Sequence, residues 1–433
     1  MTPAARLAAA IEVFGNLESE RRPAADALKS WGLAHRFAGS GDRAAIAGLV
    51  YDALRRRASS AYLMGADTPR AILLGMLKRE RALATEAIGK LADGSNYGPA
   101  ALSDDERKRL DAGHMAGAPA HVAGDYPEWL GPHFTRAFGD TRAEEGAALS
   151  SRAPLDLRVN TLKAERDKAA ALLADLKPEP TRWSPWGLRI TLTADAKSPP
   201  IHAEPAFLKG LVEIQDEGSQ LASLFSGAKP GEQVVDLCAG AGGKTLALAA
   251  MMENKGQIFA TDDDKRRLAP IHERLKRSGA RNVQVRTPKS VGDAIADLGG
   301  RCDLVLIDAP CTGTGAWRRN PDAKWRMRPG ALEQRQKEQA EILDRVLPLL
   351  KAGGRIAYVT CSVLDEENGA QVRSFLARHP EFAVQPPAEV ASALGERTLM
   401  FGKAARLSDA GILMTPRTTE TDGFFVAVLR RGG

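Results

Sequence analysis

A repeated alternation of short apolar segments and helical stretches, between residues 234 and 360, limits the folds open to this chain. Parallel strands need long crossover connections, which are usually helices, so this alternation is typical of a parallel sheet with helices on both faces. The sequence therefore predicts a doubly wound α/β domain, with one further strand at Gly423 to Leu429. The five expected strands are Val234 to Cys238, Gln257 to Asp262, Val283 to Arg286, Asp303 to Asp308 and Arg355 to Thr360.

The segments before this alternation have a different character. The first hundred or so residues carry apolar side chains at helical spacing, so we expect a helical region there. Gly94 to Gly124 is rich in Gly, Ala, Asp and Pro, which predicts a loop-rich connector. A small α/β pattern follows. A chain of 433 residues exceeds one ordinary core, and we expect three domains: residues 1–125, 126–205 and 206–433.

Charge and cysteine content narrow the class of protein. A formal charge of +6 and a pI near 9.1 are compatible with a polyanionic partner, although many proteins that bind none have such a balance. The cysteines show no CxxC spacing, so we expect reduced thiols and no metal site, with Cys238 and Cys302 as inert buried side chains. No apolar run approaches the roughly 18 residues that cross a bilayer, and no signal peptide is recognisable. We expect a cytoplasmic monomer without a membrane partner.

A glycine-rich turn follows the first predicted strand, in Asp236-Leu-Cys-Ala-Gly-Ala-Gly-Gly-Lys-Thr245. Glycines at this place let a ligand approach the backbone and the amides of the next helix. Cys238 stands where a Walker A loop needs its first glycine, and Thr245 stands where a dinucleotide fingerprint needs its last. A nucleoside-type pocket remains, in which Asp262 would accept hydrogen bonds from a ribose. S-adenosylmethionine fits, since it has a ribose and no phosphates; a tight turn that only packs a helix is the alternative.

Two cysteines follow later strands of the predicted sheet. Cys311 is the last residue of the run Asp-Ala-Pro-Cys. Cys361, in the run Thr-Cys-Ser, stands at the end of the last of the five expected strands. The carboxyl ends of parallel strands meet at one edge, so both thiols should lie near the glycine turn. Two thiols beside a cofactor pocket indicate covalent catalysis. Unpaired amides in Ser362 to Asn368, at the start of the next helix, are expected to lower a thiol pKa.

Three motifs combine into one recognisable pattern. They are the glycine turn, the run Asp308-Ala-Pro-Cys-Thr-Gly-Thr-Gly-Ala-Trp-Arg-Arg-Asn-Pro-Asp-Ala-Lys-Trp-Arg326, and Tyr358-Val-Thr-Cys-Ser-Val-Leu-Asp-Glu-Glu-Asn368. Together they closely resemble the NOL/NOP/Sun RNA cytosine-5 methyltransferases, over about half of the chain. Residues 42–57 are similar, more weakly, to the NusB-like domain of the bacterial ribosomal members. The segment after residue 126 is similar to their small linking domain.

The resemblance implies a fold and an activity. The fold would be a Rossmann-like S-adenosylmethionine-dependent methyltransferase domain, preceded by an all-α NusB-like RNA-binding domain and a small α/β linking domain. The reaction would be methylation of cytosine C5 in RNA, and the tandem arrangement favours 16S rRNA. The same chemistry on transfer RNA is one alternative. A catalytically silent RNA-binding or ribosome-assembly factor is another.

The resemblance also assigns roles to residues of this chain. Cys361 would be the nucleophile that adds to C6 of cytosine, which makes C5 able to attack the methyl sulfonium. Cys311 would assist release, Asp308 would lie between cofactor and base, and Lys244 would line the pocket. The expected cofactor residues are Cys238, Ala239, Gly240, Ala241, Gly242, Gly243, Lys244, Asp262 and Asp308.

Two positions depart from the family pattern. Ala241 stands where the family usually has proline, a change that should be tolerated because neither side chain offers a polar contact. An acidic residue commonly ends the third strand and approaches the adenine, whereas Val285 to Ser290 holds no carboxylate and the next one is Asp293. We expect adenine recognition to differ here.

The strip that follows the first thiol motif interleaves aromatic and basic residues from Trp317 to Arg326. Such a strip can pair with phosphates and stack a base, and a cytosine must be unstacked before a thiolate reaches C6. A solvated loop is the alternative.

Overall fold

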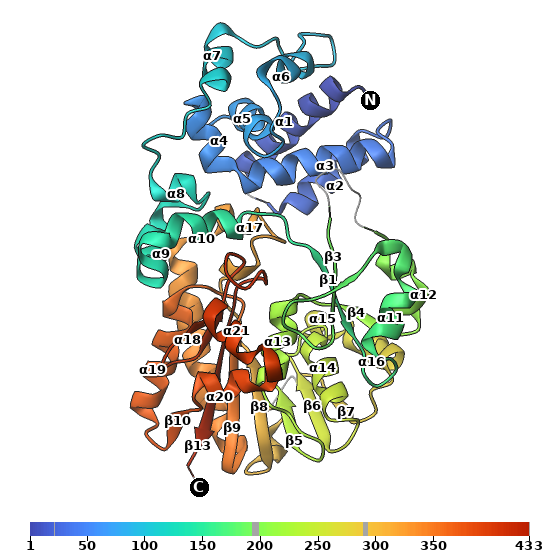
Figure 1. Cartoon of the computed structure of the whole chain (residues 1–433), viewed down its shortest axis with the longest axis vertical. Helices are drawn as coiled ribbons and strands as arrows, with labels where there is room; N and C mark the ends of the chain where they lie inside the picture. Colours follow the sequence, from blue (N-terminus) through green and yellow to red (C-terminus); the bar gives the residue numbers. More distant parts are fainter. Residues whose placement is uncertain (21, 193–198, 289–292, 433) are drawn as a thin grey trace. The chain divides into compact units, whose positions relative to one another are not determined.

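The computed structural model describes residues 1–20, 22–192, 199–288 and 293–432. The chain divides into two compact units (Figure 1). The helical unit contains Met1–Arg152 and Trp317–Arg328, and the sheet unit contains Ala153–Leu192, residues 199–316 and residues 329–432. This division groups residues by their contacts, and the domain boundaries after residues 125 and 205 stay a prediction.

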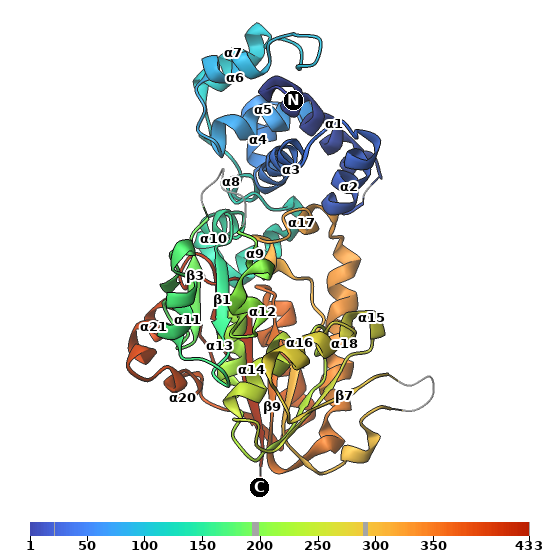
Figure 2. The same ribbon diagram turned by 90° about the vertical axis from the view of Figure 1, so that its right-hand side faces the viewer.

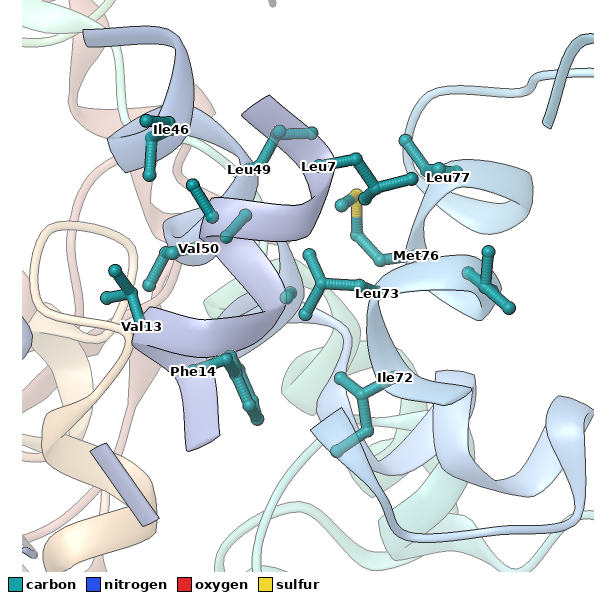
Figure 3. Packing of buried hydrophobic residues seen from close by; sticks show 14 of the residues in the cluster. Leu7, Val13, Phe14, Ile46, Leu49, Val50, Ile72, Leu73, Met76 and Leu77 are labelled. Carbon is teal, nitrogen blue, oxygen red and sulfur yellow. The ribbon is translucent and has the colours of Figure 1, made fainter. Parts of the chain in front are cut away.

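The helical unit confirms the helical character predicted for the start of the chain. Leu7, Val13 and Phe14 of its first helix pack with Val50 and Leu73 from two further helices in one buried cluster (Figure 3). Each such side chain contributes about 1.5–3 kcal/mol by leaving water. The helices are α1 (Pro3–Glu20), α2 (Ala24–Ala34), α3 (Ser40–Arg55), α4 (Arg57–Met64), α5 (Pro69–Arg79), α6 (Thr85–Leu91), α7 (Asp104–Ala112), α8 (Ala120–Ala123), α9 (Gly131–Phe138), α10 (Arg142–Leu149) and α17 (Ala323–Arg326).

The prediction of a loop-rich connector from Gly94 to Gly124 was wrong in its centre, where α7 lies. Ser103 accepts a hydrogen bond from the Glu106 amide at 3.2 Å, and the Glu106 carboxylate accepts one from the Ser103 amide at 2.9 Å. This reciprocal cap satisfies two amides that would otherwise lack partners at the helix start. Gly113, at φ +57°, then ends the helix in the left-handed conformation.

The sheet unit begins with the small α/β arrangement that the sequence predicts. Four antiparallel strands lie in the order β2-β3-β1-β4, and helices α11 and α12 pack against them in one buried cluster. The bounds are β1 (Leu155–Val159), β2 (Glu179–Pro180), β3 (Gly187–Ile190), β4 (Val212–Ile214), α11 (Arg166–Leu172) and α12 (Pro205–Leu208).

The large sheet contains all five predicted strands, and neighbours among them pair in parallel in the order β9-β8-β5-β6-β7. The further strand expected near the end is β13, which pairs antiparallel with β9, so the complete sheet is mixed. Three short strands extend that edge: β12 and β11 follow β13 in order, and β10 also pairs with β13. The bounds are β5 (Gln233–Asp236), β6 (Gln257–Thr261), β7 (Val283–Arg286), β8 (Cys302–Asp308), β9 (Leu350–Thr360), β10 (Phe382–Val384), β11 (Arg406–Leu407), β12 (Ile412–Met414) and β13 (Phe424–Arg431).

Helices cover both faces of this sheet (Figure 2). Ala357 and Val359 of β9 face one buried cluster with α13 and α14, whereas Ile356 and Tyr358 face another with α18 and α19. This alternation follows from the two-residue period of a strand. The chain winds from β5 toward β7 on one side and to β8 and β9 on the other, and such a reversal places a crevice beyond the carboxyl ends of β5 and β8. The sheet-unit helices include α13 (Glu217–Phe225), α14 (Gly243–Met251), α15 (Lys265–Leu268), α16 (Ile271–Ser278), α18 (Pro329–Arg345), α19 (Gly369–Arg378), α20 (Pro387–Ala391) and α21 (Thr398–Ala404).

No helix in the described residues combines the length and the apolar content of a bilayer span.

Candidate active site

The glycine turn leaves β5 at Asp236 and enters α14 at Gly243. Gly240 and Gly242 have φ of +50° and +83°, the left-handed region that other residues adopt at a cost. A Cβ on Gly242 would also lie 2.5 Å from Ile271, so both conformation and space require glycine there. Gly240 and Gly242 are themselves buried, and Cys238 is the residue of this turn that lines the crevice.

Asp262 directly follows β6 and turns back toward this glycine loop. Its Oδ2 accepts a hydrogen bond from the Gly240 amide at 2.9 Å, and its Oδ1 accepts one from the Asp264 amide at 3.0 Å. The side chain is almost fully buried, and each oxygen keeps a lone pair for another donor. This geometry suits a carboxylate that accepts hydrogen bonds from ribose hydroxyls.

A cavity of about 450 Å³ opens at the same place. Helix α18 supplies one side of it, a contribution that no sequence motif indicated, because only tertiary packing brings this helix to the glycine loop. The lining residues are Cys238, Asp262, Asp263, Asp264, Arg267, Pro310, Arg335, Glu338, Glu341, Ile342 and Arg345.

Lys244, in the first turn of α14, reaches across to the end of β8, where its Nζ lies 2.7 Å from Oδ2 of Asp308. Burial by itself would lower the pKa of Lys244, but the charge and hydrogen bond of Asp308, with the charge of a Cys361 thiolate, raise it. The ammonium form is therefore favoured. Burial also raises the pKa of neighbouring Asp236 to about 7, even though Thr245 donates a hydrogen bond to it at 2.6 Å.

The two thiols that follow β8 and β9 meet: Sγ of Cys311 lies 3.4 Å from Sγ of Cys361, and both side chains are half-buried. The pKa of Cys311 is raised well above its usual value by the hydrogen bond with Cys361, by burial, and by the negative charges of Cys361 and Glu367. Cys311 is therefore a thiol at neutral pH. The sequence predicted both cysteines at one edge, and the structure places them in contact.

The amides that follow Cys361 have partners, so the expectation of unpaired amides there was wrong. Ser362 and Leu364 donate to side-chain hydroxyls of Thr360 and Ser362, and Val363 donates to Thr314 at 2.9 Å. The turn is closed by hydroxyl groups before α19 begins, and these amides are not available to stabilise a thiolate.

The remaining cysteines lie in less reactive settings. Burial raises the pKa of Cys238 strongly, with help from nearby Asp308 and Asp236. Burial likewise raises the pKa of Cys302 to about 11. Cys302 is buried as expected, whereas Cys238 is only half-buried and lines the cavity. Thiols that resist ionisation are poor nucleophiles, so neither is suited to attack.

The end of the third strand lacks a carboxylate in the part of it that the structure describes. Residues 289 and 290 of the segment singled out in the sequence lie outside the described residues. Asp293 pairs with Arg345 of α18 at 3.1 Å, and Asp263 pairs with the same guanidinium at 3.3 Å.

The basic and aromatic strip belongs to the helical unit and is partly interior. Trp317 and Lys324 are buried, which excludes them from stacking a base or pairing with a phosphate. Arg319 and Arg326 are exposed, and Trp325 is half-buried. The expected RNA contact therefore narrows to the exposed arginines and the accessible part of Trp325.

Metal binding finds no support in the described ranges, since these contain no group of three or more His, Cys, Asp or Glu side chains that could hold an ion.

The chain is similar in sequence to known methyltransferases. A family model described as "16S rRNA methyltransferase RsmB/F" matches residues 225–430, and one described as "Methyltr_RsmF/B-like, ferredoxin-like domain" matches residues 126–197. Ribosomal RNA small subunit methyltransferase B of Salmonella arizonae is 35% identical over 306 residues, which cover 70% of this chain and 66% of that relative.

Solved structures extend the likeness. The crystal structure of PH0851 has a TM-score of 0.71 at 26% identity, and the match covers 100% of this chain and 99% of that chain. A methyltransferase homolog protein from Pyrococcus horikoshii has a TM-score of 0.57 at 29% identity, and the match covers 72% of this chain and 97% of that chain.

Proposed function

Because the chain belongs to the 16S rRNA methyltransferase RsmB/F family, we propose that it methylates C5 of a cytosine in 16S rRNA, with S-adenosylmethionine as methyl donor. The observation that carries this proposal is the contact between the thiols of Cys311 and Cys361, at the same sheet edge as the Lys244–Asp308 pair. A cytosine-5 transfer that begins with covalent attack needs a nucleophilic thiol, and a second thiol beside it has a use in release.

The glycine loop and its cavity fit the proposed donor. Asp262, held by the Gly240 amide, offers carboxylate oxygens to ribose hydroxyls, and it lines the cavity of about 450 Å³ together with Cys238 of the glycine loop. When bound, the donor supplies an electrophilic methyl group on a sulfonium. The proposed cofactor residues remain Cys238 to Lys244, Asp262 and Asp308.

The first proposed step belongs to Cys361. Its thiolate attacks C6 of the cytosine, the C5–C6 double bond opens, and the electron pair moves to C5, which then takes the methyl group. Lys244 is close enough for the thiolate charge to raise its pKa, so the ammonium stabilises the attacking sulfur. Asp308, held by Lys244, orients the base or the donor beside it.

The second step is release, and we assign help in it to Cys311. When the C5 proton leaves to water, its electron pair reforms the C5–C6 bond and the bond from C6 to the Cys361 sulfur breaks. The raised pKa of Cys311 keeps its proton in place, and the 3.4 Å separation lets that thiol donate a hydrogen bond to the departing thiolate. The leaving group is thereby stabilised.

Ribosomal RNA as partner is supported by the family and by the positive net charge of the chain. Such a substrate also agrees with the cytoplasmic location expected from the sequence. We propose that the helical unit contributes to RNA binding through exposed arginines such as Arg319 and Arg326.

The test is incubation with tritiated S-adenosylmethionine and either unmethylated 16S rRNA or bulk transfer RNA, followed by bisulfite mapping. One protected cytosine in 16S rRNA is the expected result. Label in transfer RNA alone would contradict the substrate and keep the chemistry. Label in neither RNA, from protein that binds the donor, would contradict the activity.

A further inference from the structure

Glu367 places a fully buried carboxylate between the two cysteine turns. It ends the short 3-10 helix η8 (Asp365–Glu367), just before α19. Its Oε1 accepts a hydrogen bond from the Thr312 amide at 2.8 Å, and its Oε2 accepts hydrogen bonds from the hydroxyls of Thr312 and Ser362, each at 2.5 Å. One carboxylate thus binds the residue after Cys311 and the residue after Cys361.

Helix α18 adds a third connection to the same carboxylate. Gln339 is fully buried, and its Nε2 donates to Oε1 of Glu367 at 3.1 Å and to the Pro310 carbonyl at 3.0 Å. The residues before and after Cys311 are therefore both tied to one hydrogen-bond network. The Glu367 carbonyl also accepts a hydrogen bond from the hydroxyl of Tyr358 at 2.7 Å, which fixes η8 to strand β9.

We propose that Glu367 is a positioning residue for both thiols: it holds the turns of Cys311 and Cys361 together so that their sulfur atoms meet, and it presents a negative charge to Cys311. This inference rests on the function proposed above for the same site. It gives a role to a residue that takes no part in the covalent steps or in the cofactor binding proposed above.

A purely structural role would not need a charge at this position. Burying a carboxylate costs more than burying a neutral amide, and the cost is offset only by good hydrogen bonds. Four donor groups surround Glu367, and an ionised carboxylate accepts from all of them: two N–H groups at Oε1 and the hydroxyls of Thr312 and Ser362 at Oε2. A glutamine could keep these contacts only as weaker, neutral hydrogen bonds, with its NH2 toward hydroxyls that had turned round to accept. The network is therefore strongest around a charged side chain.

The charge also acts on the chemistry of Cys311. The charges that act most strongly on this thiol are those of Cys361 and Glu367, and Tyr358 is near enough for its own pKa to be raised by Cys311. A negative Glu367 opposes ionisation of Cys311 and so keeps it as a hydrogen-bond donor. Loss of that charge should let Cys311 ionise at a lower pH.

The first experiment compares wild-type protein with Glu367→Gln in two measurements. Alkylation of Cys311 and Cys361 by iodoacetamide is followed across pH by peptide mass spectrometry, without RNA, and methyl transfer is followed separately. We expect the Cys311 midpoint of the variant to move down by on the order of one pH unit, and turnover to fall about 100-fold because the thiols are misplaced. An unchanged midpoint with wild-type turnover would overturn the proposal.

Asp365→Asn is the matched control, since Asp365 lies in the same 3-10 helix and pairs with Arg373 at 2.7 Å on the surface. It should behave as wild type in both measurements. Equal effects of Asp365→Asn and Glu367→Gln would mean that η8 responds as a whole, and would overturn the specific role of Glu367.

Two further variants keep the proposal testable where Glu367→Gln does not fold. Glu367→Asp keeps the charge with a shorter reach, so it should hold the Cys311 midpoint near wild type while turnover falls. Thr312→Val removes one hydroxyl and keeps the hydrogen bond from the residue 312 amide to Glu367. It should likewise keep the Cys311 midpoint near wild type while turnover falls. A midpoint that moves equally in all variants would overturn the charge effect. Wild-type protein that alkylates as expected but methylates no RNA would refute the proposed function and leave the positioning result intact.

Discussion

The ammonium of Lys244 lies 2.7 Å from Oδ2 of Asp308, across the crevice where the strand order of the large sheet reverses. The lysine is buried, whereas the aspartate side chain keeps 33% of its surface exposed. The buried ammonium therefore holds a carboxylate whose exposed part can contact a ligand in the crevice. The pair therefore connects the cofactor loop, which begins α14, with the strand that leads to Cys311.

We predict that Lys244→Met lowers cytosine methylation by roughly 10²–10³-fold, the usual effect of losing one preorganised donor at a reacting centre. The variant removes the positive charge that stabilises the Cys361 thiolate and leaves Asp308 without its partner. Single-turnover methylation measures the effect. Lys255→Met is the control, because Lys255 forms a similar 2.7 Å pair with Glu253 on the surface and should keep full activity. Equal rates for the two variants would contradict the role of Lys244.

We predict that Cys361→Ala abolishes both methyl transfer and covalent attachment to RNA, because the attacking atom is gone. The assay is methyl transfer together with denaturing gel electrophoresis of the RNA mixture. Cys302→Ala removes a buried thiol elsewhere in the sheet and should retain activity. Turnover by the Cys361 variant would refute the covalent mechanism.

Cys311→Ala should act at a different step from Cys361→Ala. Attack by Cys361 and methyl transfer proceed, but the departing thiolate loses the hydrogen bond of the neighbouring thiol, so release slows. We predict a protein–RNA adduct that survives a denaturing gel and carries one methyl group. Free methylated RNA at the wild-type rate, with no adduct, would show that Cys311 has no part in release.

Much of the fold follows from local pattern, and the site follows from the topology. The apolar segments such as Val234 to Cys238 predict strands, their alternation with helices predicts parallel pairing, and parallel pairing brings Cys311 and Cys361 to one edge. The contact between the thiols could be expected for that reason. The cap formed by Ser103 and Glu106 also had a recognisable spacing, although the composition around it favoured a loop.

Other features depend on contacts between distant parts of the chain. The acidic run that contains Glu367 resembles a solvated helix start, and nothing local indicates that Thr312, fifty-five residues earlier, would bury it. The basic strip likewise resembles a surface that binds phosphate, yet Lys324 is interior because the helical unit encloses that segment. Burial of a charged residue is decided by tertiary packing, which the local sequence pattern does not show.

Asp262→Ala should weaken cofactor binding by about 10–100-fold, the equivalent of one charge-assisted hydrogen bond. The substitution removes the acceptor proposed for the ribose and leaves the Gly240 amide without its 2.9 Å partner. Calorimetric titration with S-adenosylhomocysteine measures the affinity without RNA. Asp297→Asn serves as control, because Asp297 pairs with Arg286 away from the cavity. Unaltered affinity in the Asp262 variant would exclude this carboxylate from the cofactor site.

Lys324→Met should change how stability depends on pH. Nζ of Lys324 donates to the carbonyls of Arg55 and Asp125 and to the Ser150 hydroxyl, at 3.1, 2.6 and 2.7 Å. Burial nevertheless lowers its pKa from 10.5 to about 7. Between these values the unfolded chain holds a proton that the folded chain has lost, so rising pH favours the folded state.

The wild-type protein should therefore gain unfolding free energy relative to Lys324→Met between pH 7 and pH 9, by up to about 1.4 kcal/mol for each pH unit. Below pH 7 both states of the wild type carry the proton, and the difference between the two proteins should be constant. Urea unfolding at several pH values measures this, and Lys351→Met, which removes an exposed lysine paired with Asp303, is the control. Parallel curves for wild type and Lys324→Met would show that Lys324 keeps its proton in the folded state, held by its three oxygen acceptors.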